Sequence, residues 1–261
     1  MTLIIGAKCS DGLVMGADSG ATMGDYVSGL HTVMQPMTKL EIVGDKAIVG
    51  VSGPVGLGQL YCDRVNRIHN EFRDLDGPTV CRKLRDEFRK DAEIALRMAA
   101  IASQALGSQA RVGAVTTTLV ALAAKNEPHL IQLDSECLPE MATADLPFVS
   151  IGSGQLIADP FLAFLKRLYW KEHPPSVSDG IFAVTWTLEH AIKTAPAGII
   201  GPITLGILTI EGTQPKARLL KETELKEHRQ VVGQAENHVQ KIREELLPGA
   251  KEPEPPHPPT P

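Results

Sequence analysis

Three polar residues in the first forty positions, Thr2, Asp18 and Lys39, could form a site of nucleophilic chemistry. A small residue after Met1 permits removal of the initiator methionine, which would give Thr2 a hydroxyl nucleophile and a free α-amine. An α-amine titrates near pH ~7.7 to 8.0 and a lysine near ~10.4, so only the α-amine is appreciably neutral at pH 7. We therefore expect the α-amine to be the base and to take the hydroxyl proton through a water molecule.

Asp18 and Lys39 are expected to form an ion pair beside Thr2. Lys39 lies among apolar residues, where an unpaired ammonium would be costly to bury, and Asp18 is its natural counter-ion. A charged Lys39 would lower the pKa of the α-amine and of the hydroxyl. Each residue also has an ordinary interpretation: many chains begin Met-Thr, an Asp at a strand end is commonly a turn residue, and a Lys before a strand is commonly solvated.

Two antiparallel hairpins at the beginning of the chain would position these three residues. The predicted strands are apolar and rich in β-branched residues, and they cover residues 2–8 with 12–18 and 38–43 with 46–52. Asp11-Gly12 is a strong hairpin signal, and the hairpin folds the end of its second strand back beside Thr2. Lys39 opens the second hairpin. The charged pair is thus expected at the start of the first strand.

The remaining elements predict an α+β fold. Apolar residues recur every three or four positions in four segments, which predicts helices over 57–72, 78–106, 155–170 and 176–194. Further strands are predicted over 116–124, 129–134, 147–152, 203–210 and 217–220. This order favours a four-layer αββα sandwich, in which two antiparallel sheets pack face to face with helices outside, over alternating β-α units.

Length and composition indicate one large domain over residues 2–220, followed by two smaller segments. Residues 221–247 predict an amphipathic helix whose narrow apolar seam would pack on the body or on a neighbouring subunit. Residues 248–261 are mostly proline and are expected to be a disordered tail.

Charge and hydropathy exclude several functions. The net charge of −5 provides no basic surface for nucleic acid, and no apolar run approaches the roughly 20 residues of a membrane span. No leader precedes Thr2, so a cytoplasmic location is expected.

The four cysteines form no C-x-x-C pair and the histidines show no metal-ligand spacing, so neither metal nor cofactor is expected. Cys9 is expected to serve in packing.

The opening stretch TLIIGAKCSDGLVMGADSGAT resembles the start of proteasome β-type subunits and of their bacterial relatives of the HslV and Anbu types. Three later segments continue the resemblance: Thr38–Leu40 is similar to the segment with the catalytic lysine of the family, Ile48–Gly53 to the following strand and glycine, and Phe148–Gln155 to a later Gly-Ser-Gly turn. The four motifs occur in order and span most of residues 2–210.

The resemblance implies an N-terminal nucleophile hydrolase fold and a threonine peptidase that hydrolyses peptide bonds. It makes Thr2 the nucleophile, Asp18 and Lys39 its charged partners, and Gly53 the amide that binds the oxyanion. Ser153 would be a hydrogen-bonding partner of the α-amine. The substrate would be a peptide or an unfolded protein.

The resemblance also implies how substrate would bind. Thr22 and the residues beside Gly53 would bind the peptide backbone, while Val51 and Val55 would line the pocket for the side chain before the scissile bond, which suggests an apolar preference. The expected assembly is a homo-oligomer with its active sites inside a chamber. An ATPase unfoldase is a candidate partner.

Two departures from the family pattern leave an alternative open. Residues 194–202 contain neither carboxylate nor serine where the family usually has both, and the spacing of Asp18 from Lys39 suggests a long loop over 22–36. The alternative is a catalytically inert assembly subunit with the same fold. Nucleotide binding by the glycines of Gly50–Gly58 is disfavoured, because a second helix follows instead of the strand that a β-α-β unit requires.

Overall fold

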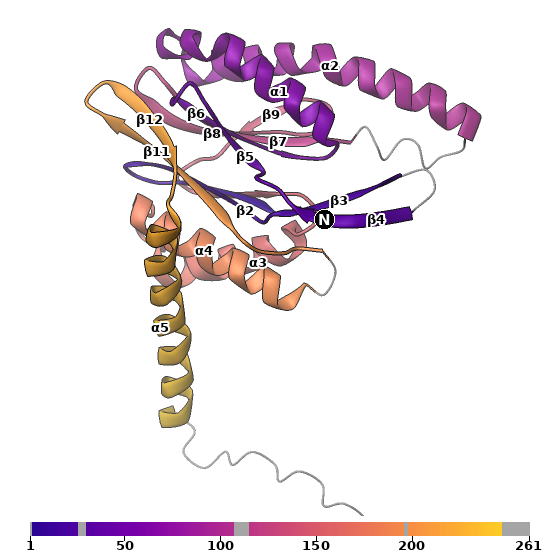
Figure 1. Ribbon diagram of the computed structural model, residues 1–261. Coiled ribbons are helices and arrows are strands. Elements are labelled where there is room, and N and C mark those ends of the chain that lie inside the picture. The colour runs from indigo at the N-terminus through magenta and orange to yellow at the C-terminus, as the bar shows by residue number, and fades with distance from the viewer. Residues whose placement is uncertain (1, 26–29, 107–114, 196–197, 247–261) are drawn as a thin grey trace, which may run out of the picture.

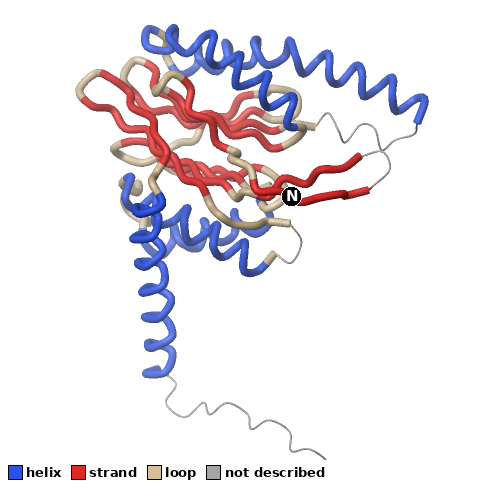
Figure 2. The backbone as a smooth tube through the Cα atoms, in the orientation of Figure 1, coloured by secondary structure: helices blue, strands red, loops and turns tan. Residues whose placement is uncertain are grey.

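The computed structural model describes residues 2–25, 30–106, 115–195 and 198–246, except for the side chains of 22–34 and 105–106. Two antiparallel five-stranded sheets lie face to face, with helices α1 and α2 over one outer face and α3 and α4 over the other (Figure 1). Helix α5 extends away from the body. The same four layers are visible as blue, red, red and blue in Figure 2. The predicted αββα sandwich is confirmed.

The strands of the second sheet follow one another in sequence, whereas the first sheet joins strands from both ends of the fold. The first sheet has the order β10 (Phe148–Ile151), β1 (Ile4–Lys8), β2 (Gly12–Ala17), β11 (Thr204–Glu211) and β12 (Gln214–Leu219). The second has the order β5 (Leu40–Val43), β6 (Ala47–Ser52), β7 (Thr117–Ala124), β8 (Glu127–Leu133) and β9 (Pro139–Met141). Both predicted N-terminal hairpins are present, one in each sheet.

The helices follow the predicted apolar spacing closely. Their bounds are α1 (Val55–Ile68), a 3-10 turn (His69–Asp74), α2 (Gly77–Leu106), α3 (Gln155–Tyr169), α4 (Val177–Thr194) and α5 (Glu222–Leu246). Helix α5 packs on α4 through buried Leu225 and Val232. No helix among the described residues is both long enough and apolar enough to cross a membrane.

The long loop predicted over 22–36 is wrong. The chain there forms a separate two-stranded ribbon of β3 (Gly20–Asp25) and β4 (Leu30–Pro36), which projects beside the start of the chain (Figure 1). The glycines and the terminal proline of this segment favour a loop when considered one by one. Antiparallel pairing satisfies the backbone polar groups despite them, with Thr22 opposite Met34 in the register.

Large apolar side chains fill the space between the layers. Alternation along β1 directs Ile4 into the cluster between the sheets, whereas Leu3 and Ile5 belong to the cluster under α3 and α4. Each of the three is fully buried, which stabilises the fold by about 1.5–3 kcal/mol per side chain. Gly6 allows the sheets to approach closely, since an added Cβ would lie 2.7 Å from Leu130 Cδ1.

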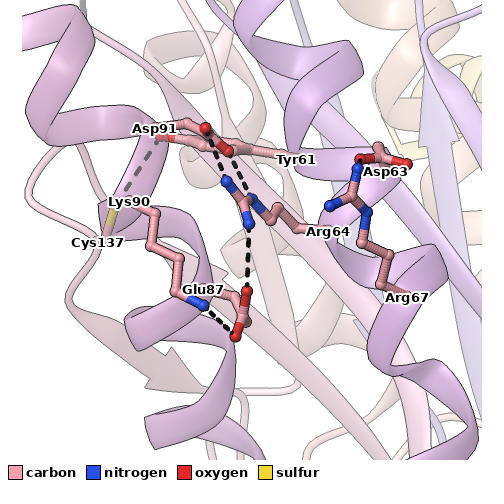
Figure 3. A network of polar contacts seen from close by, with 8 residues as sticks. All are labelled: Tyr61, Asp63, Arg64, Arg67, Glu87, Lys90, Asp91 and Cys137. Atoms are coloured by element: carbon pink, nitrogen blue, oxygen red, sulfur yellow. Dashed lines mark hydrogen bonds and ion pairs between the residues drawn. The ribbon is translucent and has the colours of Figure 1, made fainter.

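Helix α1 is fixed to α2 by a network of ion pairs (Figure 3). The Arg64 guanidinium donates two hydrogen bonds to Asp91, from Nε at 2.8 Å and from Nη2 at 3.0 Å, and Glu87 lies 3.6 Å from the same group. Tyr61 stacks on Phe88 nearby, with ring centroids 4.3 Å apart. Bidentate pairing and stacking restrict how α1 can move.

Candidate active site

The residues around Thr2 line an open cavity of about 690 Å³. Thr2 precedes β1 at one side of it, and Lys39 and Gly53, which flank the β5–β6 hairpin, lie at another. Ser153, between β10 and α3, completes this group, while α1 forms a further wall. The cavity therefore lies where both sheets end, and side chains from distant parts of the sequence reach it.

Asp18 and Lys39 form the predicted ion pair, with Lys39 Nζ 2.7 Å from Asp18 Oδ1. Their side chains are 5% and 0% exposed, so the pair is almost fully removed from water. The carboxylate also accepts the N–H of Leu3 at 2.8 Å and that of Gly20 at 2.9 Å. Three donors thus fix the orientation of Asp18 and compensate its buried charge.

Lys39 also contacts the predicted nucleophile. Its Nζ donates a hydrogen bond to Thr2 Oγ1 at 3.2 Å. Burial lowers the pKa of Lys39, and the charge and hydrogen bond of Asp18 oppose that shift. An ammonium in this position would stabilise negative charge developing on the hydroxyl oxygen.

The β10–α3 turn holds the backbone of Thr2 from the other side. The Thr2 nitrogen donates to Ser153 Oγ at 3.2 Å, and the Gly154 N–H donates to the Thr2 carbonyl at 3.1 Å. Gly152 has φ +94°, and a Cβ there would lie 2.3 Å from the Thr2 carbonyl oxygen. Glycine at position 152 is thus required sterically for the turn to approach Thr2 this closely.

Gly53 lies at the bend between β6 and α1 and lines the cavity together with Thr2. Its φ of +144° disfavours any residue with a side chain, and an added Cβ would lie 2.8 Å from the Val115 carbonyl oxygen. Glycine therefore permits this bend, and the backbone of residue 53 is open to a molecule bound in the cavity.

The late segment without carboxylate or serine contacts the site through its backbone. The Ile200 carbonyl accepts the Ser19 N–H at 2.9 Å and the Ser19 hydroxyl at 3.2 Å. An added Cβ on Gly20 would lie 2.9 Å from the Gly198 carbonyl oxygen. The segment supports the Asp18–Gly20 turn rather than supplying an acid.

The predicted substrate-binding residues have different positions. Val51 and Val55 both line the cavity, whereas Thr22 lies in β3 and its side chain is outside the described residues. Sequence reasoning missed Glu41, Gln59 and Cys62, which also line the cavity. Two spacings could have indicated them. Glu41 lies two positions after Lys39, so both side chains are on one side of the extended chain. Gln59 and Cys62 lie four and seven positions after Val55, on the same face of α1.

Cys9 is a packing residue, as its surroundings suggest. It is buried, which raises the pKa of its thiol to about 12, and an added Cβ on Gly180 of α4 would lie 2.7 Å from its Sγ. Within the described part of the chain, no group of His, Cys, Asp and Glu residues has an arrangement that could hold a metal ion.

The family model for the proteasome subunit matches residues 2–196, more than half of the chain. The matched region carries Thr2, Asp18, Lys39, Gly53 and Ser153. The chain belongs to the proteasome subunit family.

Solved structures of Anbu proteins share the fold of this proteasome-family chain. Anbu (ancestral beta-subunit) from Yersinia bercovieri is 15% identical, with a TM-score of 0.64 over 95% of this chain and 99% of that chain. The Gly-1 mutant of Anbu from Hyphomicrobium sp. strain MC1 is also 15% identical, with a TM-score of 0.65 over 92% of this chain and 97% of that chain. The helical assembly of the Anbu complex from Pseudomonas aeruginosa is 15% identical, with a TM-score of 0.66 over 97% of this chain and 98% of that chain. No curated protein sequence matches the chain significantly.

Proposed function

We propose that this chain is a threonine peptidase that uses Thr2 after removal of Met1. The observation that carries the proposal is the contact of Lys39 Nζ with Thr2 Oγ1 at 3.2 Å, made by a lysine that is itself paired with buried Asp18. An isolated surface threonine has no such neighbour. The membership of the proteasome subunit family points in the same direction.

In the first step, Thr2 Oγ1 attacks the carbonyl carbon of the scissile peptide bond. The free α-amine takes the hydroxyl proton through a water molecule, which is worth ~10² to 10⁴ in rate. Ser153 supports the amine, because its Oγ already accepts a hydrogen bond from the Thr2 nitrogen. Lys39 lowers the pKa of the hydroxyl electrostatically.

The tetrahedral oxyanion is stabilised by the Gly53 amide, an effect typically worth about 3 kcal/mol. The carbon–nitrogen bond then breaks, the α-amine returns its proton to the leaving amine, and an ester remains on Thr2. Water hydrolyses this ester by the same base catalysis and restores the hydroxyl. Val51 and Val55 contact the side chain before the scissile bond, and Thr22 binds the peptide backbone.

The active form we propose is a homo-oligomer that cleaves peptides or unfolded proteins inside a chamber, with an ATPase unfoldase as a candidate partner. A cytoplasmic location is part of the same prediction. One of the solved structures with this fold is described as a helical assembly, which is a property of that Anbu complex.

A catalytically inert assembly subunit is the second candidate. It is favoured by residues 194–202, where neither a carboxylate nor a serine is available to support the α-amine. Under this alternative, the Asp18–Lys39 pair would serve only to stabilise the fold.

Two measurements distinguish the candidates. Intact-mass spectrometry should show loss of Met1, because a retained methionine would occupy the nitrogen that must act as base. Fluorogenic peptides should then be cleaved by the wild type and not by Thr2→Ala, with Thr2→Ser as the control that retains a hydroxyl. Equal rates for wild type and Thr2→Ala would establish the inert subunit.

A further inference from the structure

The cavity beside Thr2 extends between α1 and the β5–β6 hairpin, where its walls are mostly aliphatic. Val49 and Val51 line it from β6, and Val55 lines it from the start of α1. Gly58 in α1 faces Val51, since an added Cβ would lie 3.3 Å from Val51 Cβ. The absence of a side chain at Gly58 thus lets α1 approach Val51 closely, and both residues line the cavity.

One carboxylate, that of Glu41, belongs to this aliphatic wall. Alternation along β5 settles which face of the sheet it occupies: Leu40 and Ile42 pack in the cluster between the sheets, and Val43 packs under the helices. Glu41 therefore projects toward α1. Its register partner in β6 is Val49, which also lines the cavity.

Cys62 lines the same cavity from α1, the helix toward which Glu41 projects. It is a buried residue of α1 that lines the cavity. Burial raises the pKa of its thiol well above the ordinary value, and a hydrogen bond to Glu41 raises that pKa further. Glu41 and Cys62 thus line the same cavity from β5 and α1, and Glu41 is exposed.

Charge in the cavity is unevenly compensated. Among the described residues that line it, Lys39 and Glu41 carry formal charges, and Lys39 is paired with Asp18 at 2.7 Å. No lysine, arginine or histidine of the described residues forms an ion pair with Glu41. A bound cation would therefore meet a net negative charge beyond the Asp18–Lys39 pair.

We propose that Glu41 makes the cavity selective for peptides that carry arginine or lysine before the scissile bond. The inference rests on the proposed peptidase function. The aliphatic stem of either side chain can pack on the valines, while its charged head pairs with the carboxylate. A leucine or phenylalanine would cover the carboxylate without pairing it, which costs free energy. This proposal differs from the apolar preference expected from Val51 and Val55, and the test below distinguishes the two.

The test uses three fluorogenic peptides that differ only at the residue before the scissile bond: arginine, citrulline and norleucine. Citrulline has nearly the shape of arginine without its charge. The wild type should cleave the arginine peptide with kcat/KM about tenfold above that of the citrulline peptide, the effect of one charged pair. Glu41→Gln should remove this difference, whereas Glu136→Gln, which removes an exposed charge outside the cavity, should retain it.

The outcomes separate the two proposals. Cleavage of the norleucine or citrulline peptide as fast as the arginine peptide by wild type would overturn the selectivity and leave the peptidase function intact. Absence of cleavage of all three peptides by wild type, at the level of Thr2→Ala, would overturn the peptidase function and the selectivity with it. The comparison of arginine with citrulline needs only wild-type protein, so it holds even if Glu41→Gln folds poorly.

Discussion

At the scale of single residues, the carboxylate of Asp18 has two roles. It compensates the charge of Lys39, and it binds the backbone next to Thr2. It pairs with Lys39 and also accepts the N–H of Leu3, the residue that follows Thr2. Asp18 thus contributes to the position of both Lys39 and the start of β1, while Ser153 and Gly154 hold the Thr2 backbone from the other side. Breaking a buried pair by removing one charge leaves the other charge without compensation.

Asp18→Asn keeps nearly the same side-chain shape but removes the negative charge that compensates the buried Lys39 ammonium. It should therefore lower the free energy of unfolding by about 3–5 kcal/mol. Urea denaturation at fixed protein concentration measures this change. Glu211→Gln is the matched control, since it breaks the exposed pair with Lys216 and should cost less than about 1 kcal/mol. Similar effects of both variants would contradict a desolvated pair at the site.

At the scale of elements, local signals in the sequence predicted much of what positions the site. The Asp-Gly turn and the apolar runs around it predicted the β1–β2 hairpin, and with it the proximity of Asp18 to Thr2. Pairing of this kind needs only neighbouring residues. The contact of Ser153 with Thr2 joins residues 151 positions apart. No local pattern predicts such a contact, so its prediction depended on the family resemblance.

Two features could not be predicted from local patterns. The β3–β4 ribbon contains glycine and proline, and it forms through antiparallel pairing that overrides their preference for loops. The place of Glu41 in the cavity depends on how α1 packs over β5, a tertiary contact that strand periodicity alone does not specify. In both cases the missing information is the packing of one element on another.

Gly152→Ala tests the turn between β10 and α3. The new methyl group would collide with the Thr2 carbonyl, and φ +94° is unfavourable for alanine, so the free energy of unfolding should fall by about 1–3 kcal/mol. Peptide cleavage should fall with it, because Thr2 must shift. Thermal unfolding and turnover of the peptides measure the two effects.

Gly233→Ala provides the control for this variant. It lies within α5 with nothing within 4 Å of an added Cβ, so the substitution should stabilise the helix by about 0.5–1 kcal/mol. An unchanged stability and activity of Gly152→Ala would show that the turn does not constrain Thr2.

At the scale of the whole molecule, apolar side chains remain uncovered on two helices. On α2, Ile94, Met98 and Ile101 are 63%, 61% and 60% exposed and share one face at helical spacing. On α5, Val239 and Ile242 are exposed beyond the part that packs on α4. Clusters of this kind commonly mark contacts between proteins, which supports the proposed homo-oligomer.

The double substitution Met98→Glu and Ile101→Glu should therefore dissociate the oligomer, because charges would have to be buried in the contact between copies. Light scattering coupled to size-exclusion chromatography measures the mass. Leu138→Glu changes a single exposed residue in a turn and should leave the mass as in wild type. A wild-type protein of 28.1 kDa in solution would contradict the assembly.

The hydrogen bonds between the β10–α3 turn and Thr2 have a consequence for when the proposed peptidase becomes active. Thr2 is synthesised 151 residues before Ser153, which together with Gly154 holds the Thr2 backbone. Until the later segment has been made, Thr2 lacks both of these hydrogen bonds. In the proposed peptidase, an unfinished copy would thus lack part of the arrangement that cleavage requires, which would protect other newly made proteins around it.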